Sequence, residues 1–322
     1  MLLLHGFPEL AYSWRKVMPA LAAAGFHAIA PDQRGYGRTT GWDGRYDTEL
    51  EAFRALNLVE DAAQLVARLE LPGVHVVGHD FGSPVAACCA LTRPSVFRSV
   101  VLMSAPVGGV AVRSSAVLEE LAALGRKHYQ WYYSTPEADA DMRRAPQGVA
   151  PFLRAYYHYK SADWKGNQPF RLKDWVAGEL AKMPTYYIME LDKGMAETVA
   201  PHMPAGASGW LTDAELAVYA ESFERTGFQG GLNWYRCATS AQHVAAVAAA
   251  IGPRTIDVPS MFIAGAADWG VYQKPGEFER MQECVCTDFR GAHIVPGAGH
   301  WVQQEQPERT TELLMRFLGA VA

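Results

Sequence analysis

One short turn limits what this chain can fold into more than any other feature. Residues 78–82 read Gly-His-Asp-Phe-Gly, after a Val-rich run at 74–77 and before an Ala-rich stretch of helical composition. This is the pattern of a strand-turn-helix elbow that presents a nucleophile, with Asp80 where Ser usually stands. Glycines are needed at both ends of this motif because such a turn is strained and leaves no space there for side chains. The competing interpretation is an ordinary turn whose Asp80 caps the next helix.

Short apolar runs alternate with amphipathic stretches on both sides of this turn. Strand-like runs lie at 2–4, 27–30, 74–77, 99–103, 260–264 and 293–295, and helical spacing occurs at 14–24, 57–69 and 307–318. This alternation predicts an α/β fold with a mostly parallel sheet and helices on both faces. From 107 to 239 prolines recur, and aromatic and charged residues stand at helical spacings. We therefore expect a core formed by residues 1–106 and 240–322, interrupted by an all-helical lid at 107–239.

Composition and charge exclude several classes of function. The 322 residues are 49% hydrophobic and 20% charged, as in a globular chain with a sizeable core. The formal net charge of −5 is mild, and no basic stripe points to nucleic acid or to a membrane surface. No apolar window is long enough for a membrane span or a signal peptide. The five cysteines have neither disulfide nor metal-binding spacing, so we expect reduced thiols and a cytoplasmic protein.

Two loops farther along the chain supply partners for a nucleophile on the turn. Asp268 follows the strand-like run at 260–264, and His300 follows the run at 293–295. The order nucleophile, acid, histidine is the triad order of folds with this elbow. A single Asp or His on a loop is usually just solvated, but two of them directly after strands favour a catalytic role. The sequence therefore predicts the triad Asp80, Asp268 and His300.

The segment after the first strand-like run is a candidate oxyanion hole. Residues 5–9 read His-Gly-Phe-Pro-Glu, and the glycine lets the backbone approach a reacting centre. Pro8 has no N–H group, so the N–H of Phe7 is the natural donor, with that of Phe81 as the second. An ordinary turn is the competing interpretation.

An aspartate nucleophile favours a particular chemistry. A carboxylate with an ordinary pKa of about 3.9 is ionised at pH 7 and attacks without help from a base. Attack on an sp³ carbon that bears a leaving group gives an alkyl ester on Asp80. His300, held by Asp268, then has the single task of activating the water that cleaves the ester. This chemistry favours epoxides or alkyl halides over peptides and ordinary esters.

Four motifs link the chain to a known family. They are His-Gly-Phe-Pro-Glu at 5–9, Pro-Asp-Gln-Arg-Gly-Tyr-Gly at 31–37, Gly-His-Asp-Phe-Gly at 78–82 and Gly-His-Trp at 299–301. In these motifs, and over essentially its whole length, the chain resembles the soluble, cytosolic-type epoxide hydrolases of the α/β-hydrolase superfamily. The resemblance implies the α/β-hydrolase fold and hydrolysis of an epoxide to a diol without a metal or cofactor.

The resemblance also implies that two lid tyrosines polarise the epoxide oxygen. The segment 128–133 marks Tyr129, with Gln130 beside it, and the longer match at 226–236 marks Tyr235. Phenols stay protonated at pH 7, so they can donate to the alkoxide that forms when the ring opens. We expect Gln130, Trp269 and Trp301 to line the substrate pocket. The expected partners are a small apolar epoxide and water, with no nucleic acid and no membrane, and a homodimer stays open.

The chain differs from the members of the family that it resembles in two features. Those relatives usually have Trp directly after the nucleophile, where this chain has Phe81. Haloalkane dehalogenases hold the halide with that Trp, and fluoroacetate dehalogenases have Arg there, so haloalkane- or haloacid-type dehalogenation is the second interpretation. A catalytically silent ligand-binding protein is the alternative from another class. The relatives also have an antiparallel strand pair before the His-Gly motif, so we expect the N-terminal edge strands to be missing.

Overall fold

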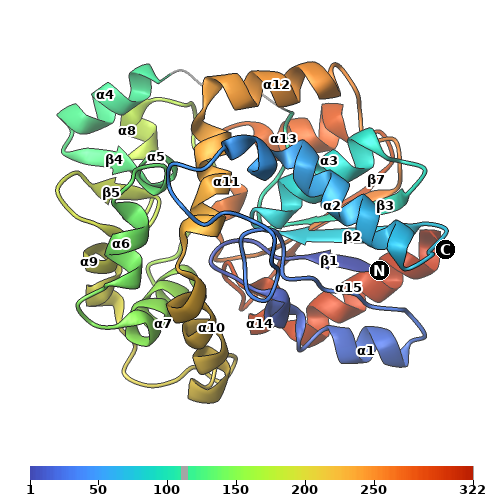
Figure 1. Cartoon of the computed structure of the whole chain (residues 1–322), viewed down its shortest axis with the longest axis horizontal. Helices are drawn as coiled ribbons and strands as arrows, with labels where there is room; N and C mark the ends of the chain where they lie inside the picture. Colours follow the sequence, from blue (N-terminus) through green and yellow to red (C-terminus); the bar gives the residue numbers. More distant parts are fainter. Residues whose placement is uncertain (110–114, 322) are drawn as a thin grey trace.

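Five parallel strands form the central sheet. The computed structural model describes residues 1–109 and 115–321. The strand order is β1 (Leu2–Leu4), β2 (Val74–His79), β3 (Phe97–Met103), β6 (Ser260–Gly265) and β7 (Phe289–Val295). Neighbouring strands in this order are all parallel. The predicted α/β fold with a mostly parallel sheet is confirmed (Figure 1).

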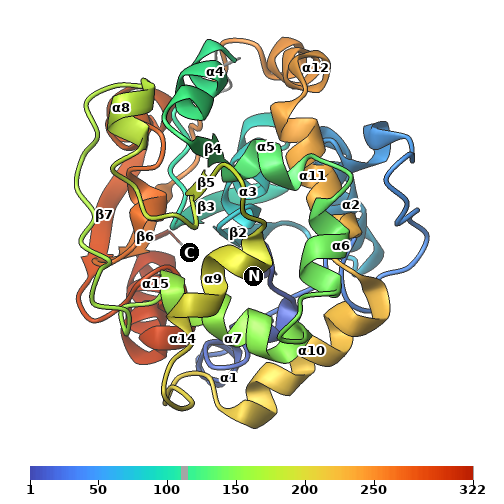
Figure 2. The same ribbon diagram turned by 90° about the vertical axis from the view of Figure 1, so that its left-hand side faces the viewer.

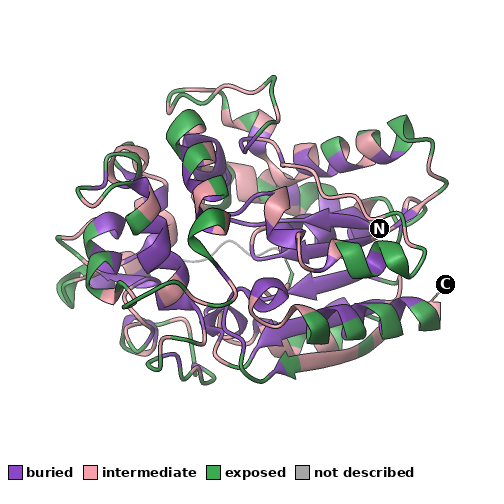
Figure 3. Cartoon of the chain, turned by 90° about the horizontal axis from the view of Figure 1, so that it is seen from below, coloured by how far each residue is buried: buried purple, intermediate pink, exposed green. Residues whose placement is uncertain are grey.

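Alternate residues of the strands enter two separate hydrophobic cores. Val76 of β2 belongs to the core on one face of the sheet, and Val77 belongs to the core on the other. The first face is covered by α2 (Ala55–Arg68) and α3 (Gly82–Thr92), and the second by α1 (Met18–Ala23) and α15 (Pro307–Val321) (Figure 1). Because both faces are covered, the central strands are buried and read as continuous apolar runs (Figure 3).

Two predicted elements near the N-terminus are shorter than expected. Residues 27–30 contribute only a parallel bridge between Ile29 and Leu2, because Pro31 has no N–H group to extend the ladder. The predicted helix at 14–24 is divided into a 3₁₀ turn, η1 (Ala11–Trp14), and α1, which begins at Met18 next to Pro19. Within the described residues, the sheet contains no antiparallel strand.

The inserted segment, residues 107–239, leaves the sheet after β3 and returns to α12 (Ala241–Ile251). Its helices lie together on one side of the sheet domain and face the viewer in Figure 2. They are α4 (Ala116–Ala123), α5 (Tyr129–Tyr133), α6 (Ala138–Arg143), α7 (Val149–Lys160), α8 (Ala177–Leu180), α9 (Met195–Val199), α10 (Asp213–Thr226) and α11 (Gln229–Thr239).

The expectation of an all-helical insertion is wrong in one detail. β4 (Arg126–His128) and β5 (Ile188–Glu190) form a small antiparallel sheet within the inserted segment. Strands of three residues are too short to give a visible alternation in the sequence.

The remaining elements are short. They are the 3₁₀ turns η2 (Leu50–Phe53), η3 (Ala200–His202) and η4 (Trp269–Val271), the π-helical turn η5 (Met281–Val285), α13 (Glu277–Arg280) and α14 (Val302–Glu305). Among the described helices, none combines the length and the apolar character that crossing a membrane requires.

Two glycines allow the inserted segment to touch the backbone of the core. A Cβ atom on Gly230 would lie 2.1 Å from the carbonyl oxygen of Gly35, a distance that no side chain tolerates. A few residues along α11, Trp234 Nε1 donates a hydrogen bond to the carbonyl of Arg34 at 3.0 Å. The core loop at 32–37 therefore fixes the position of α11, the helix that carries Tyr235.

Candidate active site

A sharp turn at the end of β2 carries Asp80. Asp80 has φ = 51°, a left-handed conformation that residues with a side chain rarely adopt. A Cβ atom on Gly78 would lie 2.0 Å from the carbonyl oxygen of Gly82, and one on Gly82 would lie 2.3 Å from that of Leu4. These contacts explain the small residues at both ends of the motif. The turn places Asp80 at the carboxyl edge of the sheet, where ligands bind in open α/β folds.

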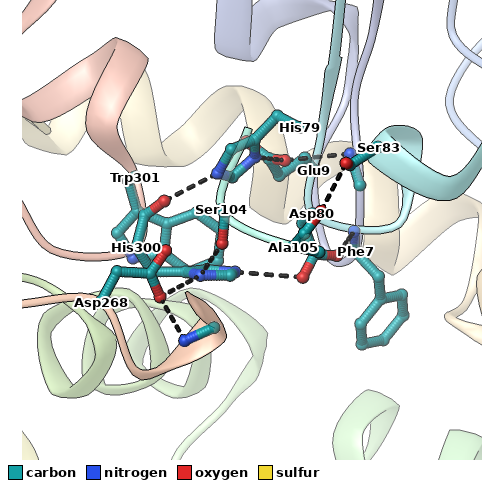
Figure 4. A network of polar contacts seen from close by, with 12 residues as sticks. Phe7, Glu9, His79, Asp80, Ser83, Ser104, Ala105, Asp268, His300 and Trp301 are labelled. Atoms are coloured by element: carbon teal, nitrogen blue, oxygen red, sulfur yellow. Dashed lines mark hydrogen bonds and ion pairs between the residues drawn. The ribbon is translucent and has the colours of Figure 1, made fainter. Parts of the chain in front are cut away.

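Three side chains from three loops meet at this edge (Figure 4). His300 Nε2 lies 3.1 Å from Asp80 Oδ2, and His300 Nδ1 lies 3.0 Å from Asp268 Oδ1. Asp268 Oδ1 also accepts a hydrogen bond from the N–H of Gly270 at 2.7 Å. All three side chains of the predicted triad are buried. The structure thus brings Asp80, His300 and Asp268 together in the order that a triad requires.

The surroundings of both carboxylates favour their ionised forms. Burial raises the pKa of Asp80, but the contact with His300 and the charges of His300 and Lys160 outweigh burial, so this pKa lies below its ordinary value. For Asp268, burial likewise raises the pKa, and the charge of His300 and the N–H of Gly270 contribute to a net lowering. An ionised Asp80 is ready to attack carbon, and an ionised Asp268 can orient an imidazole.

The loop after β1 brings one backbone donor to the nucleophile. The N–H of Phe7 donates to Asp80 Oδ1 at 3.0 Å. A Cβ atom on Gly6 would lie 2.4 Å from that same oxygen, so only glycine permits the approach. The N–H of Phe81, the second expected donor, has no acceptor among the described residues. The N–H of Phe7 therefore donates to the carboxylate of Asp80. The N–H of Phe81 is available to donate to an oxyanion that forms during the reaction.

The two predicted tyrosines face the nucleophile from the inserted segment. Tyr129 of α5 and Tyr235 of α11 have ring centres 5.9 Å apart, and both line a cavity of about 760 Å³ that reaches Asp80. The hydroxyl of Tyr129 donates to Gln273 Oε1 at 3.0 Å and accepts from Gln130 Nε2 at 3.2 Å. Among the described residues, the hydroxyl of Tyr235 has no hydrogen-bond partner.

The electrostatic setting keeps both phenols protonated. Burial, reinforced by the negative charge of Asp80, raises the pKa of Tyr129 and that of Tyr235 well above the ordinary value. A protonated phenol that faces a carboxylate nucleophile across a cavity can donate a proton to a leaving oxygen.

The expected pocket residues are only partly where the sequence placed them. Gln130 lines the cavity, whereas Trp269 and Trp301 do not and are buried. Trp301 Nε1 donates to the carbonyl of Tyr157 at 2.9 Å, and its ring packs against His300 with centres 4.6 Å apart. Trp301 therefore packs against the imidazole of His300 and does not face the cavity. The direction of a side chain on a loop depends on tertiary packing, which a motif does not encode.

A buried polar network lies behind the elbow (Figure 4). His79 Nδ1 lies 2.6 Å from Glu9 Oε2, and His79 Nε2 donates to the carbonyl of His300 at 2.7 Å. Glu9 also accepts hydrogen bonds from the N–H of Gly6 and from Gln303 Nε2. Burial lowers the pKa of His79, but the adjacent Glu9 carboxylate outweighs burial and raises it overall. His79 thus hydrogen-bonds behind the elbow and does not face the substrate side, and Glu9 is a partner that the sequence did not single out.

Two further residues hold His300 without any clear signal in the sequence. Ser104 Oγ lies 2.8 Å from His300 Nδ1, on a residue with φ = 67° directly after β3. Its place at the end of a strand was the only available hint. The carboxylate of Glu305 accepts hydrogen bonds from the N–H groups on both sides of His300 and from one in the inserted segment: Gly299, Trp301 and Ala162, at 2.9, 3.0 and 2.8 Å.

The chain is similar to known proteins along nearly its full length. Residues 1–307 match the family described as alpha/beta hydrolase fold. The chain is 33% identical to epoxide hydrolase B of Mycobacterium tuberculosis, over 99% of this chain and 91% of that protein. It is 34% identical to epoxide hydrolase A of the same species, over 98% of this chain and 89% of that protein.

Solved structures show the same similarity. An epoxide hydrolase from an endophytic Streptomyces superposes with a TM-score of 0.80 at 34% identity, over 99% of this chain and 88% of that one. Epoxide hydrolase I of potato (Solanum tuberosum) gives a TM-score of 0.78 at 29% identity, over 99% and 92% of the two chains.

Proposed function

The chain belongs to the alpha/beta hydrolase fold family, and on that premise we propose that it is an epoxide hydrolase, which converts an epoxide to a vicinal diol. The similarity to named epoxide hydrolases confirms the family resemblance in the motifs. One observation carries the proposal. An ionised Asp80, in contact with His300, shares a cavity with two protonated phenols, Tyr129 and Tyr235.

The first step that we assign to this site is the opening of the ring. An oxygen of Asp80 forms a bond to one ring carbon, the bond from that carbon to the epoxide oxygen breaks, and its electron pair stays on the oxygen. Tyr235 and Tyr129 donate hydrogen bonds to this oxygen, and one of them supplies its proton. Tyr235 is the more available donor because its hydroxyl has no partner among the described residues. The product is a hydroxyalkyl ester on Asp80.

The second step is hydrolysis of this ester. His300 Nε2 takes a proton from water, and the resulting hydroxide attacks the carbonyl carbon of Asp80. The N–H groups of Phe7 and Phe81 stabilise the oxyanion. Collapse of the tetrahedral intermediate releases the diol oxygen, which takes the proton from His300. The carboxylic acid left on Asp80 then returns its proton to the tyrosinate that the first step formed, so that the nucleophile is ionised and the phenol protonated again. Asp268, 3.0 Å from His300 Nδ1, orients the imidazole and stabilises its charged form.

Removing the phenol of Tyr235 is expected to slow ring opening without stopping it. In Tyr235→Phe we expect ester formation to fall by about 10- to 100-fold, because general acid catalysis contributes about 10²–10⁴-fold and Tyr129 still donates. Rapid-quench measurement of the ester checks this. The double variant Tyr129→Phe/Tyr235→Phe should be slower again, whereas Tyr272→Phe, a half-buried tyrosine outside the cavity, serves as the matched control. Ester formation at the wild-type rate in Tyr235→Phe would remove this residue from the mechanism.

Ester formation is expected to depend little on pH. Because the pKa of Asp80 lies below its ordinary value of about 3.9, the nucleophile stays ionised at every pH above that value. Because the pKa values of Tyr129 and Tyr235 lie above the ordinary value of about 10, the acids stay protonated below it. Single-turnover ester formation should therefore be flat from about pH 5 to about pH 9. A fall that begins near neutral pH would contradict these assignments.

Two substrates separate epoxide hydrolysis from dehalogenation. Styrene oxide and 1-bromobutane each present an sp³ carbon with a leaving group to Asp80. Phe81 lacks the indole N–H that would help to hold a halide, so we expect diol from styrene oxide and no bromide from 1-bromobutane. Bromide release without diol formation would overturn the proposal in favour of dehalogenation. Neither product, from a folded protein, would favour a ligand-binding role.

We also propose that the inserted segment, residues 107–239, is a lid on a core formed by 1–106 and 240–322. The triad comes from the core and both tyrosines come from the inserted segment, so the site is complete only where the two meet.

Five free cysteines support a cytoplasmic location. A homodimer is the assembly to test, by light scattering.

A further inference from the structure

Much of the lining of the cavity at Asp80 is apolar. Its apolar side chains include Leu91 of α3, Val107 after β3, and Val244, Val247 and Ile251 of α12. Its volume of about 760 Å³ lies in the upper part of the range for small-molecule sites, about 300–1,000 Å³. A space of this size and character can hold a long apolar group next to the nucleophile.

The ring of Tyr235 separates an open side of the site from a closed side. Its centre lies 5.0 Å from that of Phe81 and 5.4 Å from that of Phe7, with both contacts edge-on. Phe81 lines the cavity and is half-buried, whereas Phe7 does not line it and is 0% exposed. The cavity therefore extends from Tyr235 toward Phe81, and it does not extend toward Phe7.

Aromatic side chains fill the Phe7 side. The ring of Tyr133 lies 5.3 Å from that of Phe7, and its hydroxyl donates to Tyr156 at 3.3 Å. The ring of Tyr156 lies 6.3 Å from that of Trp301, which packs against His300. Tyr133, Tyr156 and Trp301 are at most 1% exposed and do not line the cavity, so their rings pack against neighbouring side chains. A substituent on this side would have to displace close-packed rings.

A buried lysine completes the closed side. Lys160 Nζ lies 4.9 Å from the ring centre of Tyr187, 5.3 Å from that of Tyr156 and 5.4 Å from that of Trp301. Such cation–π contacts stabilise an ammonium group that is withdrawn from water. The carbonyl of Lys160 also accepts the N–H of His300 at 3.0 Å. A displacement of Lys160 would also displace His300, the residue that activates water for ester hydrolysis. A substituent that pushes into the closed side would therefore slow the reaction.

We propose that the preferred substrate is a terminal epoxide with one long apolar arm. The arm lies on the Phe81 side, along α12, and the unsubstituted ring carbon faces the Phe7 side. This inference rests on the proposed function and adds the substrate class to it. Epoxides that carry long groups on both ring carbons are excluded, because the second group meets the packed rings of Tyr133 and Tyr156.

Two isomers test this proposal on the wild-type protein. 1,2-Epoxydodecane has one long arm, and trans-6,7-epoxydodecane has the same composition with the ring at its centre. We expect kcat/KM for diol formation to be higher for the terminal isomer by at least about tenfold, since even a single methylene group changes kcat/KM by about 10- to 200-fold in a well-packed pocket. Equal values, or a preference for the internal isomer, would overturn the proposal.

A variant on the open side gives an independent test. Val244→Trp places an indole in the path of the arm, so kcat/KM for 1,2-epoxydodecane relative to that for 1,2-epoxypropane should fall by about tenfold or more. Val218→Trp makes the same change on the exposed surface of α10 and should leave this ratio unchanged. An unchanged ratio in a folded Val244→Trp protein would contradict the placement of the arm. If the wild-type protein forms no diol from these epoxides or from styrene oxide, the proposed function fails, and this inference fails with it.

Discussion

Replacing Asp80 by Ala is expected to abolish diol formation and to lower kcat/KM by about 10⁴-fold or more. The carboxylate supplies the oxygen that bonds to the substrate, and the ester on Asp80 is the only species on which His300 acts in this mechanism. Without that ester, a correctly placed base and acid have nothing to hydrolyse. Gas chromatography of the diol with saturating enzyme measures the residual rate.

A second aspartate gives the control for this variant. Asp61 pairs with Arg34 at 2.5 Å on the surface of α2, where an ion pair contributes little to stability. Asp61→Ala should therefore keep the wild-type rate. An Asp80→Ala protein that folds and retains more than about one hundredth of the activity would contradict the assignment of the nucleophile, because loss of a nucleophile costs far more than that.

Replacing His300 by Gln is expected to stop the reaction at the covalent ester. The base is needed for the second step only, because a carboxylate attacks carbon without help from a base. When His300 is replaced, the charge of Lys160 and the N–H of Phe7 still favour the ionised form of Asp80. We expect ester formation to stay within about tenfold of the wild-type rate, while hydrolysis falls by about 10³-fold. The protein should therefore accumulate as an adduct during the first turnover.

Peptide mass spectrometry identifies this adduct on the fragment that contains Asp80. His293→Gln is the matched control, since His293 is a half-buried histidine on β7 near Arg309 and Arg316. This control should turn over normally and accumulate no ester. The assignment of His300 as the base of the second step fails if the His300→Gln protein binds substrate and yields no adduct.

Parallel strands explain why so much of the site could be predicted from the sequence. The carboxyl ends of such strands meet at one edge, so Asp80, Asp268 and His300 approach one another although they are far apart in the chain. Apolar runs marked the strand ends, and the residues just after them marked the site. The motif at 226–236 identified Tyr235 in the same way, because it reports how α11 packs on the core.

Features that depend on tertiary packing between distant parts of the chain could not be predicted. Trp301 was expected in the pocket wall, but its indole turns away to the carbonyl of Tyr157. The contacts of Glu305 and Ser104 around His300 could not be predicted either, because no sequence motif contains both partners of these contacts. The closed side of the cavity has the same origin, because aromatic residues at helical spacing look alike whether they line a pocket or fill it.

Oxygen labelling in a single turnover tests the covalent mechanism most directly. With protein in excess over a terminal epoxide in H₂¹⁸O, the first diol should contain no ¹⁸O, because its new oxygen comes from the carboxylate of Asp80. The peptide that carries Asp80 should gain ¹⁸O from the water that cleaves the ester. Appearance of ¹⁸O in the diol of the first turnover, with none on Asp80, would show direct attack of water on the epoxide and would contradict the account.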